Sequence, residues 1–232
     1  MNSFLHEIKA FLKREIKITS DGSSTIHLPD WGESYHSTHG AIQEAKHVFL
    51  KQGLEAVPKT EIVILEIGYG TGLNCFLTLL ASQSKKKKID YVGVEAYPVT
   101  KEEHLHLNYI SELKEESQQP LYDKMFAVSW EKKHQIYDEF FLTKRKQHFK
   151  EIEDQNYFDL IYFDAFGAEH QPELWTTSIF KKMFEALKLN GVLVTYSAKG
   201  SVRRAMQEVG FSVERLEGPP GKREMLRATK KN

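Results

Sequence analysis

Apolar positions along this chain fall into two repeating patterns. Short and nearly continuous apolar runs, such as residues 61–67 and 157–163, are typical of strands covered on both faces of a parallel sheet. Longer stretches between them carry apolar residues at helical spacing. The strands predicted after residue 60 are residues 61–67, 90–95, a segment within 139–143, 157–163, 191–197, 211–216 and 224–229. The predicted helices are residues 39–51, 72–81, 100–113, 178–188 and 201–209.

The alternation of these strands and helices predicts an α/β fold. Helices are expected on both faces of a mostly parallel, seven-stranded, Rossmann-like sheet. The last two strands are joined by a short turn at residues 217–222, which predicts an antiparallel hairpin at one edge. Residues 111–134 are rich in lysine and acidic residues, and we interpret them as an insertion of helices and loops.

The N-terminal part of the chain carries a separate signal. Two short segments, residues 16–19 and 25–28, flank the turn Asp21-Gly22 and predict a small β-hairpin. This hairpin precedes the first long helical pattern. We therefore divide the chain into an N-terminal β extension, residues 1–38, and a Rossmann-like domain, residues 39–232.

Composition adds bounds on size and location. The 232 residues are 41% hydrophobic, which suffices for one α/β domain with a full core. Basic and acidic residues number 32 each, so an acidic partner would have to meet a local basic patch. The single cysteine, Cys75, cannot form an internal disulfide, and the charged first residues do not resemble a signal peptide. With no apolar stretch long enough to cross a membrane, we expect a cytoplasmic protein that binds no membrane.

The strongest chemical signal is the sequence EIGYGTGLN at residues 66–74. Its glycines let a strand turn sharply into a helix and let the backbone approach a ligand closely. The helix that follows offers unpaired N–H groups at its start. The acid that ends the next predicted strand, Glu95, can accept both hydroxyl protons of a ribose.

A ribose is common to NAD and S-adenosylmethionine, so Glu95 does not separate the two. The glycine spacing favours S-adenosylmethionine, because the third glycine of a dinucleotide fingerprint would stand where Leu73 stands. Glu66 also suits a ligand with a positive amino group and a sulfonium better than a phosphate. A nicotinamide-dependent oxidoreductase remains the alternative at this point.

A second acid follows the strand at residues 157–163. In an open parallel sheet, ligands lie beyond the C-terminal ends of the strands, where Asp164 is expected. After so apolar a strand, this carboxyl is expected to be partly buried at the mouth of the site. It could cap the following loop, or it could hold, orient or deprotonate a nucleophile.

Further motifs carry a specific resemblance. They are DAF at 164–166, PELW at 172–175, NGVLVTYSAKGSVRRAMQEVGF at 190–211 and GKREM at 221–225, together with Tyr35-His36-Ser37, Gly40 and Glu44. The chain resembles, over roughly residues 25–230, the methyltransferase half of the bifunctional tRNA 5-methylaminomethyl-2-thiouridine biosynthesis protein MnmC. It looks closer still to the stand-alone form of that half, MnmD. Since the chain stops at Asn232, the flavin-dependent half is expected to be absent.

The resemblance implies an activity and a donor site. The activity is S-adenosylmethionine-dependent N-methylation of 5-aminomethyl-(2-thio)uridine to 5-methylaminomethyl-(2-thio)uridine at the wobble position (U34) of tRNA. Asp164 would lie beside the transferable methyl group and the incoming amine. The residues expected to bind the donor are Tyr35, Glu66, Gly68, Gly70, Gly72, Asn74, Glu95 and Asp164. The family's acid that contacts adenine after the third strand is missing here, where the chain reads LTKRKQHFKEI.

The chemistry of an amine acceptor gives Asp164 its expected role. An aliphatic amine is protonated at neutral pH and then has no lone pair with which to attack a methyl group. Asp164 is the candidate to remove that proton. No metal is expected, because the ten histidines show no clear ligand cluster. A small-amine methyltransferase or aminopropyltransferase would share these features and remains an alternative.

The C-terminal segment is the candidate tRNA-binding region. From Lys199 onward there are nine basic residues and four acids in an otherwise neutral chain. Such residues contact phosphates and give affinity rather than base choice. The candidates for RNA contact are Lys199, Arg203, Arg204, Lys222 and Arg223. The candidates for stacking on a flipped-out base are Phe166, Trp175 and Tyr196.

Overall fold

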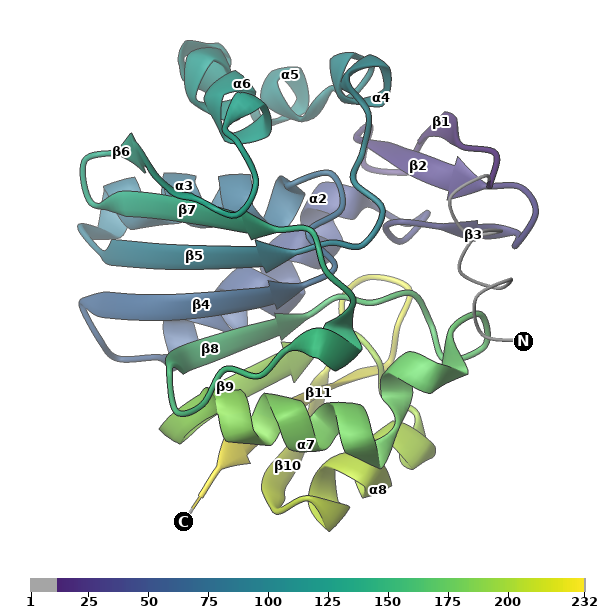
Figure 1. Cartoon of the computed structure of the whole chain (residues 1–232). Coiled ribbons are helices and arrows are strands. Elements are labelled where there is room, and N and C mark those ends of the chain that lie inside the picture. The colour runs from purple at the N-terminus through teal and green to yellow at the C-terminus, as the bar shows by residue number, and fades with distance from the viewer. Residues whose placement is uncertain (1–11, 232) are drawn as a thin grey trace.

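A computed structural model describes residues 12–231 and contains a central eight-stranded sheet (Figure 1). The strand order is β10-β11-β9-β8-β4-β5-β7-β6. The five strands from β9 to β7 run parallel, and the pairs β10–β11, β11–β9 and β6–β7 are antiparallel. The strands are β4 (Glu61–Ile67), β5 (Lys88–Val94), β6 (Lys133–Tyr137), β7 (Phe140–Arg145), β8 (Phe158–Phe163), β9 (Leu187–Thr195), β10 (Phe211–Glu217) and β11 (Glu224–Lys230).

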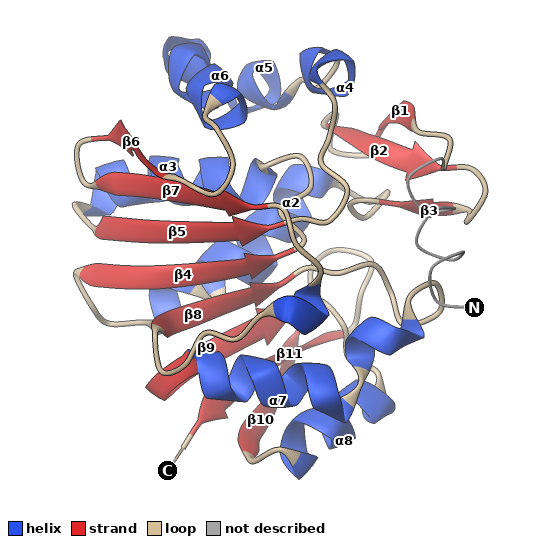
Figure 2. Cartoon of the chain, in the orientation of Figure 1, coloured by secondary structure: helices blue, strands red, loops and turns tan. Residues whose placement is uncertain are grey.

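Helices cover both faces of the sheet (Figure 2). The helices α2 and α3 lie on one face, and α7 and α8 lie on the other. The α-helices are α2 (Ala41–Ala45), α3 (Leu73–Lys85), α4 (Lys101–Leu105), α5 (Tyr109–Leu113), α6 (Gln119–Ala127), α7 (Thr177–Ala186) and α8 (Gly200–Glu208). The π-helical turn η1 (Lys46–Lys51) continues α2, and the 3₁₀ turns are η2 (Leu54–Ala56), η3 (Glu116–Gln118), η4 (Phe149–Glu151) and η5 (Pro172–Trp175).

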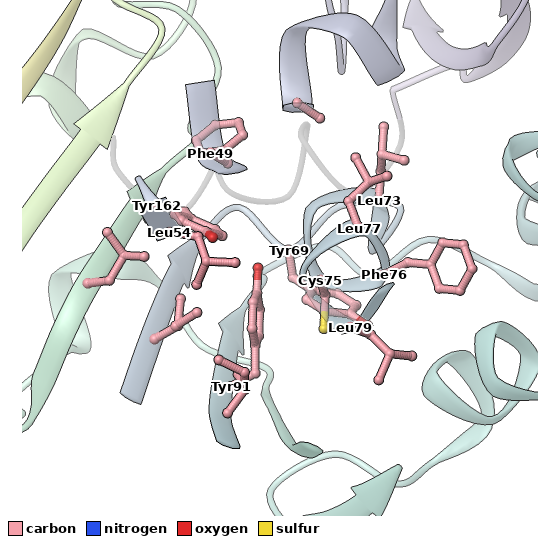
Figure 3. Close-up of a cluster of buried hydrophobic side chains, with 14 of the residues drawn as sticks. Phe49, Leu54, Tyr69, Leu73, Cys75, Phe76, Leu77, Leu79, Tyr91 and Tyr162 are labelled. Carbon is pink, nitrogen blue, oxygen red and sulfur yellow. The ribbon is translucent and has the colours of Figure 1, made fainter. Parts of the chain in front are cut away.

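The apolar runs of the central strands fill two cores, one on each face. In β4, Ile62 and Ile64 belong to the core under α3, while Leu65 and Ile67 belong to the core under α7. This follows from the two-residue period of a strand, which turns successive side chains to opposite faces. Figure 3 shows the first core, where Cys75 packs among aromatic and aliphatic side chains. Cys75 is fully buried, and burial raises the pKa of its thiol, so it is a packing residue.

The α/β fold class is confirmed, and all seven predicted strands are present as β4, β5 and β7–β11. The sheet has an eighth strand, β6, which was not predicted and which begins at the end of the segment 111–134 interpreted as helices and loops. Only Ile136 of β6 is buried, so this edge strand carries no apolar alternation by which it could be recognised. The single helix predicted at residues 100–113 is two helices, α4 and α5. Asn108 interrupts them, because its side chain binds the backbone of Gly22 and Ser24.

The predicted N-terminal hairpin is confirmed and gains a third strand. Strands β1 (Glu15–Ile18), β2 (Ser24–Leu28) and β3 (Glu33–Ser34) form a small antiparallel sheet. It lies across the edge at which the parallel strands end (Figure 1). Residues 1–11, with the expectation about the leading segment, lie outside the described residues. The division at residue 38 stays a prediction.

A core substitution tests this packing. We expect Phe180→Ala to lower the free energy of unfolding by about 3–5 kcal/mol, because a fully buried ring leaves a cavity when it is removed. Phe180 packs 5.2 Å, centroid to centroid, from Phe163 of β8. Leu189→Ala, at a side chain that is 55% exposed, is the control and should change stability by less than about 0.5 kcal/mol. Urea denaturation would measure both, and equal effects would contradict the assigned core.

Candidate active site

A cavity of about 850 Å³ opens at the C-terminal edge of the sheet. The glycine loop, Glu95 and Asp164 line it, together with Trp31 and Tyr35, which flank strand β3 of the N-terminal sheet. These positions follow β4, β5 and β8, three adjacent parallel strands. The topology therefore brings together the loop and the two acids that the sequence singled out.

The glycine loop needs its glycines for two separate reasons. Gly68, Gly70 and Gly72 have φ of 87°, 48° and 77°, which are left-handed conformations that disfavour other residues. A Cβ atom on Gly68 would also stand 2.5 Å from the carbonyl oxygen of Asp164. The backbone of the loop can therefore lie directly against the end of β8, with the cavity above it.

Glu95 is held by two backbone hydrogen bonds. Its Oε2 accepts from the N–H of Gly70 at 3.0 Å, and its Oε1 accepts from the N–H of Tyr97 at 2.9 Å. Each carboxylate oxygen can accept a second hydrogen bond, so a pair of adjacent hydroxyls in the cavity has two acceptors available. Glu95 is thus placed as expected for a ribose ligand, and that binding role stays a prediction.

Asn74 connects two carboxyls of the site, the buried one of Glu66 and the partly buried one of Asp164. Its Nδ2 donates to Glu66 Oε1 and to Asp164 Oδ2, both at 2.9 Å. Glu66 also accepts from the hydroxyl of Tyr91 at 2.9 Å and is fully buried, which raises its pKa well above the ordinary value. Glu66 does not line the cavity. Its place therefore does not support the predicted direct contact with the donor, and its carboxyl group binds the amide of Asn74 instead.

The remaining oxygen of Asn74 is an open acceptor. Asn74 Oδ1 is buried and has no hydrogen-bond partner within residues 12–231, and Asn74 lines the cavity. A buried acceptor without a partner is costly unless a ligand or water supplies a donor. Together with Glu95 and the glycine loop, it fits a ligand that carries both an amino group and a ribose, as S-adenosylmethionine does.

Asp164 is poised to exchange protons near neutral pH. Its N–H donates to Ile67 O at 2.9 Å, which fixes the residue beside the glycine loop. Burial and the nearby Glu44 carboxylate raise the pKa of Asp164 to about 7, against the opposing effects of Asn74 and Lys222. A carboxyl with such a pKa can accept and release a proton at physiological pH.

Three aromatic side chains that line the cavity pack against one another: Trp31 and Tyr35 beside the N-terminal sheet, and Phe166 after β8. The ring of Phe166 meets the edges of Tyr35 and Trp31, with centroids 5.0 Å and 5.6 Å away. Arg14 lies over the ring of Tyr35 and donates to the carbonyl of Tyr97 at 2.9 Å. Arg14 therefore connects Tyr35 to the loop after β5. Arg14 and Trp31 were not predicted, because no motif marks contacts between distant positions such as Arg14 and Tyr97, which are 83 residues apart.

The three aromatic candidates occupy different places. Phe166 and Tyr196 line the cavity. Trp175 is only 6% exposed and lies in the core under α7. Its indole N–H donates to the carbonyl of Phe166 at 2.7 Å. Trp175 therefore supports the loop that carries Phe166 and is not available as a stacking surface.

The five basic candidates also divide. Arg204 and Arg223 are exposed, Arg203 is partly buried, and Lys199 forms an exposed ion pair with Glu169. Lys222, in contrast, lines the cavity. The sequence placed Lys222 on an RNA-binding surface, but the structure places it inside the candidate active site.

The end of the cavity next to β7 is lined by residues that sequence analysis did not select. His148 and Phe149 lie there, in the segment that lacks the family's usual acid. Arg145, at the end of β7, turns instead to Asp154 and forms two hydrogen bonds of 2.7 Å and 3.1 Å. The missing acid was itself the signal that other side chains must form this end.

Within residues 12–231, no group of three or more histidine, cysteine, aspartate or glutamate side chains is placed to hold a metal ion. No helix in that range is long and apolar enough to cross a membrane.

Comparison with known proteins gives a consistent set of similarities. Residues 113–231, just over half of the chain, match a family described as S-adenosyl-L-methionine-dependent methyltransferase. In fold and sequence, the chain is similar to the crystal structure of MnmC2 from Aquifex aeolicus. The TM-score is 0.71 at 25% identity, and the match covers 99% of this chain and 76% of that one.

Two curated relatives carry the name tRNA 5-methylaminomethyl-2-thiouridine biosynthesis bifunctional protein MnmC. The protein from Actinobacillus pleuropneumoniae serotype 5b (strain L20) is 29% identical over 231 residues, covering 90% of this chain and 34% of the relative. The protein from Cupriavidus metallidurans is 27% identical over 227 residues, covering 90% and 32%. The chain thus spans about a third of the length of these relatives.

Donor binding tests the assignment of Glu95. We expect Glu95→Ala to weaken binding of S-adenosylhomocysteine by roughly 10–100-fold, because hydrogen bonds to a charged acceptor contribute about 1.5–3 kcal/mol. Isothermal titration calorimetry would measure the affinity. Glu102→Ala, on the exposed face of α4, is the matched control and should bind as the unmodified protein does. Equal affinity in the two variants would show that Glu95 holds no part of the donor.

Proposed function

Because the chain belongs to the family of S-adenosyl-L-methionine-dependent methyltransferases, we propose that it methylates the wobble uridine of tRNA. The reaction would convert 5-aminomethyl-(2-thio)uridine to 5-methylaminomethyl-(2-thio)uridine. The observation that carries this proposal is the position of Asp164, a carboxyl of pKa about 7 that lies against the glycine loop. Family membership argues against the nicotinamide alternative, and nothing in the site favours aminopropyl transfer over methyl transfer.

The donor half of the cavity consists of the glycine loop and the ends of β4, β5 and β7. In the proposed complex, Glu95 accepts from the ribose hydroxyls and Asn74 Oδ1 accepts from the amino group. His148 and Phe149, which line the cavity next to β7, would hold the adenine. Bound there, S-adenosyl-L-methionine supplies a methyl group whose bond to the positively charged sulfur breaks as the bond to the acceptor nitrogen forms.

Asp164 performs the proton transfer in this proposal. Its Oδ2 is held by Asn74, so Oδ1 is free to face the acceptor amine. The ionised carboxylate attracts the incoming ammonium, takes its proton and leaves a neutral nitrogen with a lone pair. The loop holds donor and carboxyl side by side, so positioning supplies the rest of the rate enhancement.

The proposed tRNA surface adjoins the mouth of the cavity. Lys199 is the N-cap residue of α8 and pairs with Glu169, and the nearby residues Gly167 and His170 line the cavity. Basic side chains at this place would contact phosphates on either side of the flipped-out base. The exposed part of this surface is formed by Lys199, Arg204 and Arg223, and Arg203 beside them is partly buried. A cytoplasmic location, where tRNA is found, is part of the same proposal.

Replacing Asp164, the proposed general base, tests the proposed chemistry. We expect Asp164→Asn to reduce methyl transfer to tRNA at least about 100-fold, because a general base contributes 10²–10⁴-fold to rate. Binding of S-adenosylhomocysteine should change by no more than a few fold. The assay uses labelled donor and tRNA that carries the unmethylated aminomethyl group. Full activity in this variant would remove Asp164 from the mechanism, and transfer to small amines without tRNA would favour the alternative acceptor.

The pH dependence follows from the same group. Asp164 acts in its ionised form, so kcat/KM should fall as pH drops through about 7 and protonates the carboxyl. Steady-state rates measured from about pH 5.5 to about pH 8.5 would show this fall in kcat/KM, because the range extends more than about one unit to either side of the pKa. A rate that stays flat between pH 6 and 8 would contradict a base with this proton affinity.

The RNA surface has its own test. We expect the combined change Arg204→Ala and Arg223→Ala to weaken tRNA binding and to lower the slope of log affinity against log salt by about 1–2. Binding of S-adenosylhomocysteine should not change. Lys88→Ala, at the N-terminal end of β5 and therefore away from the cavity, is the control. Titration of labelled tRNA at several salt concentrations would measure the slope, and an unchanged slope would exclude these two arginines from the contact.

A further inference from the structure

An ion pair in the part of the cavity outside the proposed donor half has no part in the mechanism above. It joins Glu44 of α2 to Lys222 of the turn between β10 and β11, with 2.6 Å between Oε1 and Nζ. Glu44 is only 8% exposed, and both residues line the cavity together with Asp164. A carboxylate this buried needs a partner, and its partner comes from 178 positions along the chain.

The backbone fixes both ends of this pair. The second oxygen of Glu44 accepts from the N–H of Ser37 at 2.8 Å. On the other side, the N–H of Lys222 donates to Pro219 O at 2.9 Å, which closes the turn. The ring of His47 donates to Glu217 O at 2.8 Å and thus ties the turn to η1. The ion pair is therefore a built feature rather than a chance surface contact.

The pair also reaches the loop that carries the proposed base. The ammonium of Lys222 lies 3.9 Å from the centroid of the Tyr196 ring, in a cation–π contact. The hydroxyl of Tyr196 donates to the carbonyl of Ala165 at 2.8 Å, and Ala165 directly follows Asp164. An unbroken series of contacts thus runs from α2 to the backbone beside the reacting carboxyl.

Charge balance gives the pair a second effect on Asp164. Four titratable groups face this carboxyl from the elements around it: Glu44 of α2, Lys222 of the turn, Glu66 of β4 and Tyr196 after β9. The negative charge of Glu44 opposes ionisation of Asp164, and the positive charge of Lys222 favours it. While the pair is intact, these two effects act against each other.

We propose that the Glu44–Lys222 pair is a positioning element for methyl transfer, which holds Tyr196 and the loop after β8 in place and balances the charge around Asp164. Neither residue is the proposed general base. The catalytic part of this inference rests on the proposed function, whereas the charge balance can be measured without any acceptor.

The first experiment titrates Asp164 in the intact protein. The carboxyl carbon is followed by NMR with ¹³C-labelled aspartate and is identified by its loss in Asp164→Asn. We expect Glu44→Gln to lower the titration midpoint by about one pH unit and Lys222→Met to raise it by about one unit. Lys222→Arg should stay within a few tenths of a unit of the unmodified protein. Midpoints that do not move, or that move together, would overturn the charge-balance role.

The second experiment measures kinetics on the same variants. We expect Glu44→Gln and Lys222→Met to lower kcat on the order of 10–100-fold with KM for the donor unchanged, because the base is misplaced. Lys222→Arg should restore most of the rate, and the pH limb of kcat/KM should shift in the directions seen by NMR. Unchanged kcat in both disruptive variants would overturn the positioning role.

The experiments distinguish a failure of the proposed function from a failure of the charge-balance role. Binding of S-adenosylhomocysteine by each variant identifies any that does not fold. The double variant of Glu44→Gln and Lys222→Met removes both charges and should return the midpoint of Asp164 toward its original value, and a midpoint far from it would count against the balance. If the unmodified protein methylates no tRNA while the NMR shifts occur as expected, the proposed function fails and the charge balance stands.

Discussion

The close approach of two backbone segments, at Gly68 and Asp164, is the constraint on which the site depends. The carbonyl of Asp164 occupies the space that a side chain on Gly68 would fill, and the N–H of Asp164 binds Ile67. This contact holds a ligand loop and a carboxyl of raised pKa next to each other at the end of adjacent strands. Every chemical role assigned above requires that adjacency.

The two parts of the cavity that we propose to hold the donor and the acceptor differ in how they are built. The donor half uses backbone groups, since Glu95 is oriented by N–H groups and the loop is shaped by glycine conformations. The acceptor half uses side chains drawn from distant parts of the chain, including Glu44 and Lys222. Trp31 and Tyr35, which flank strand β3 of the N-terminal sheet, also line the cavity and contact Phe166. A common donor with a variable acceptor is the arrangement expected for a methyltransferase fold that serves many substrates.

The sequence was sufficient wherever a local pattern carried the information. The central strands were found because both of their faces are covered, and Gly68, Glu95 and Asp164 were found because strand ends in a parallel sheet converge. Strand β6 escaped because only one of its residues is buried. Glu66 was expected to touch the donor, since a sequence does not reveal that Asn74 intervenes.

Other parts of the site depended on contacts between distant positions. Lys222 looked like a surface residue in a basic segment, and only the packing of its turn against α2 brings it into the cavity. Arg14 and Trp31 lie in a segment without a recognisable motif, and their roles arise from contacts across the cavity. Pairings of this kind follow from tertiary structure, which a single sequence does not display.

The central claim is that this cavity delivers a methyl group to an amine on the wobble uridine of tRNA. The most direct measurement is mass spectrometry of nucleosides from aminomethyl-bearing tRNA after incubation with the protein and donor carrying a ¹³C-methyl group. The account predicts 5-methylaminomethyl-(2-thio)uridine with the label on its new methyl carbon. An unlabelled wobble nucleoside, from protein that demonstrably binds the donor, would contradict it.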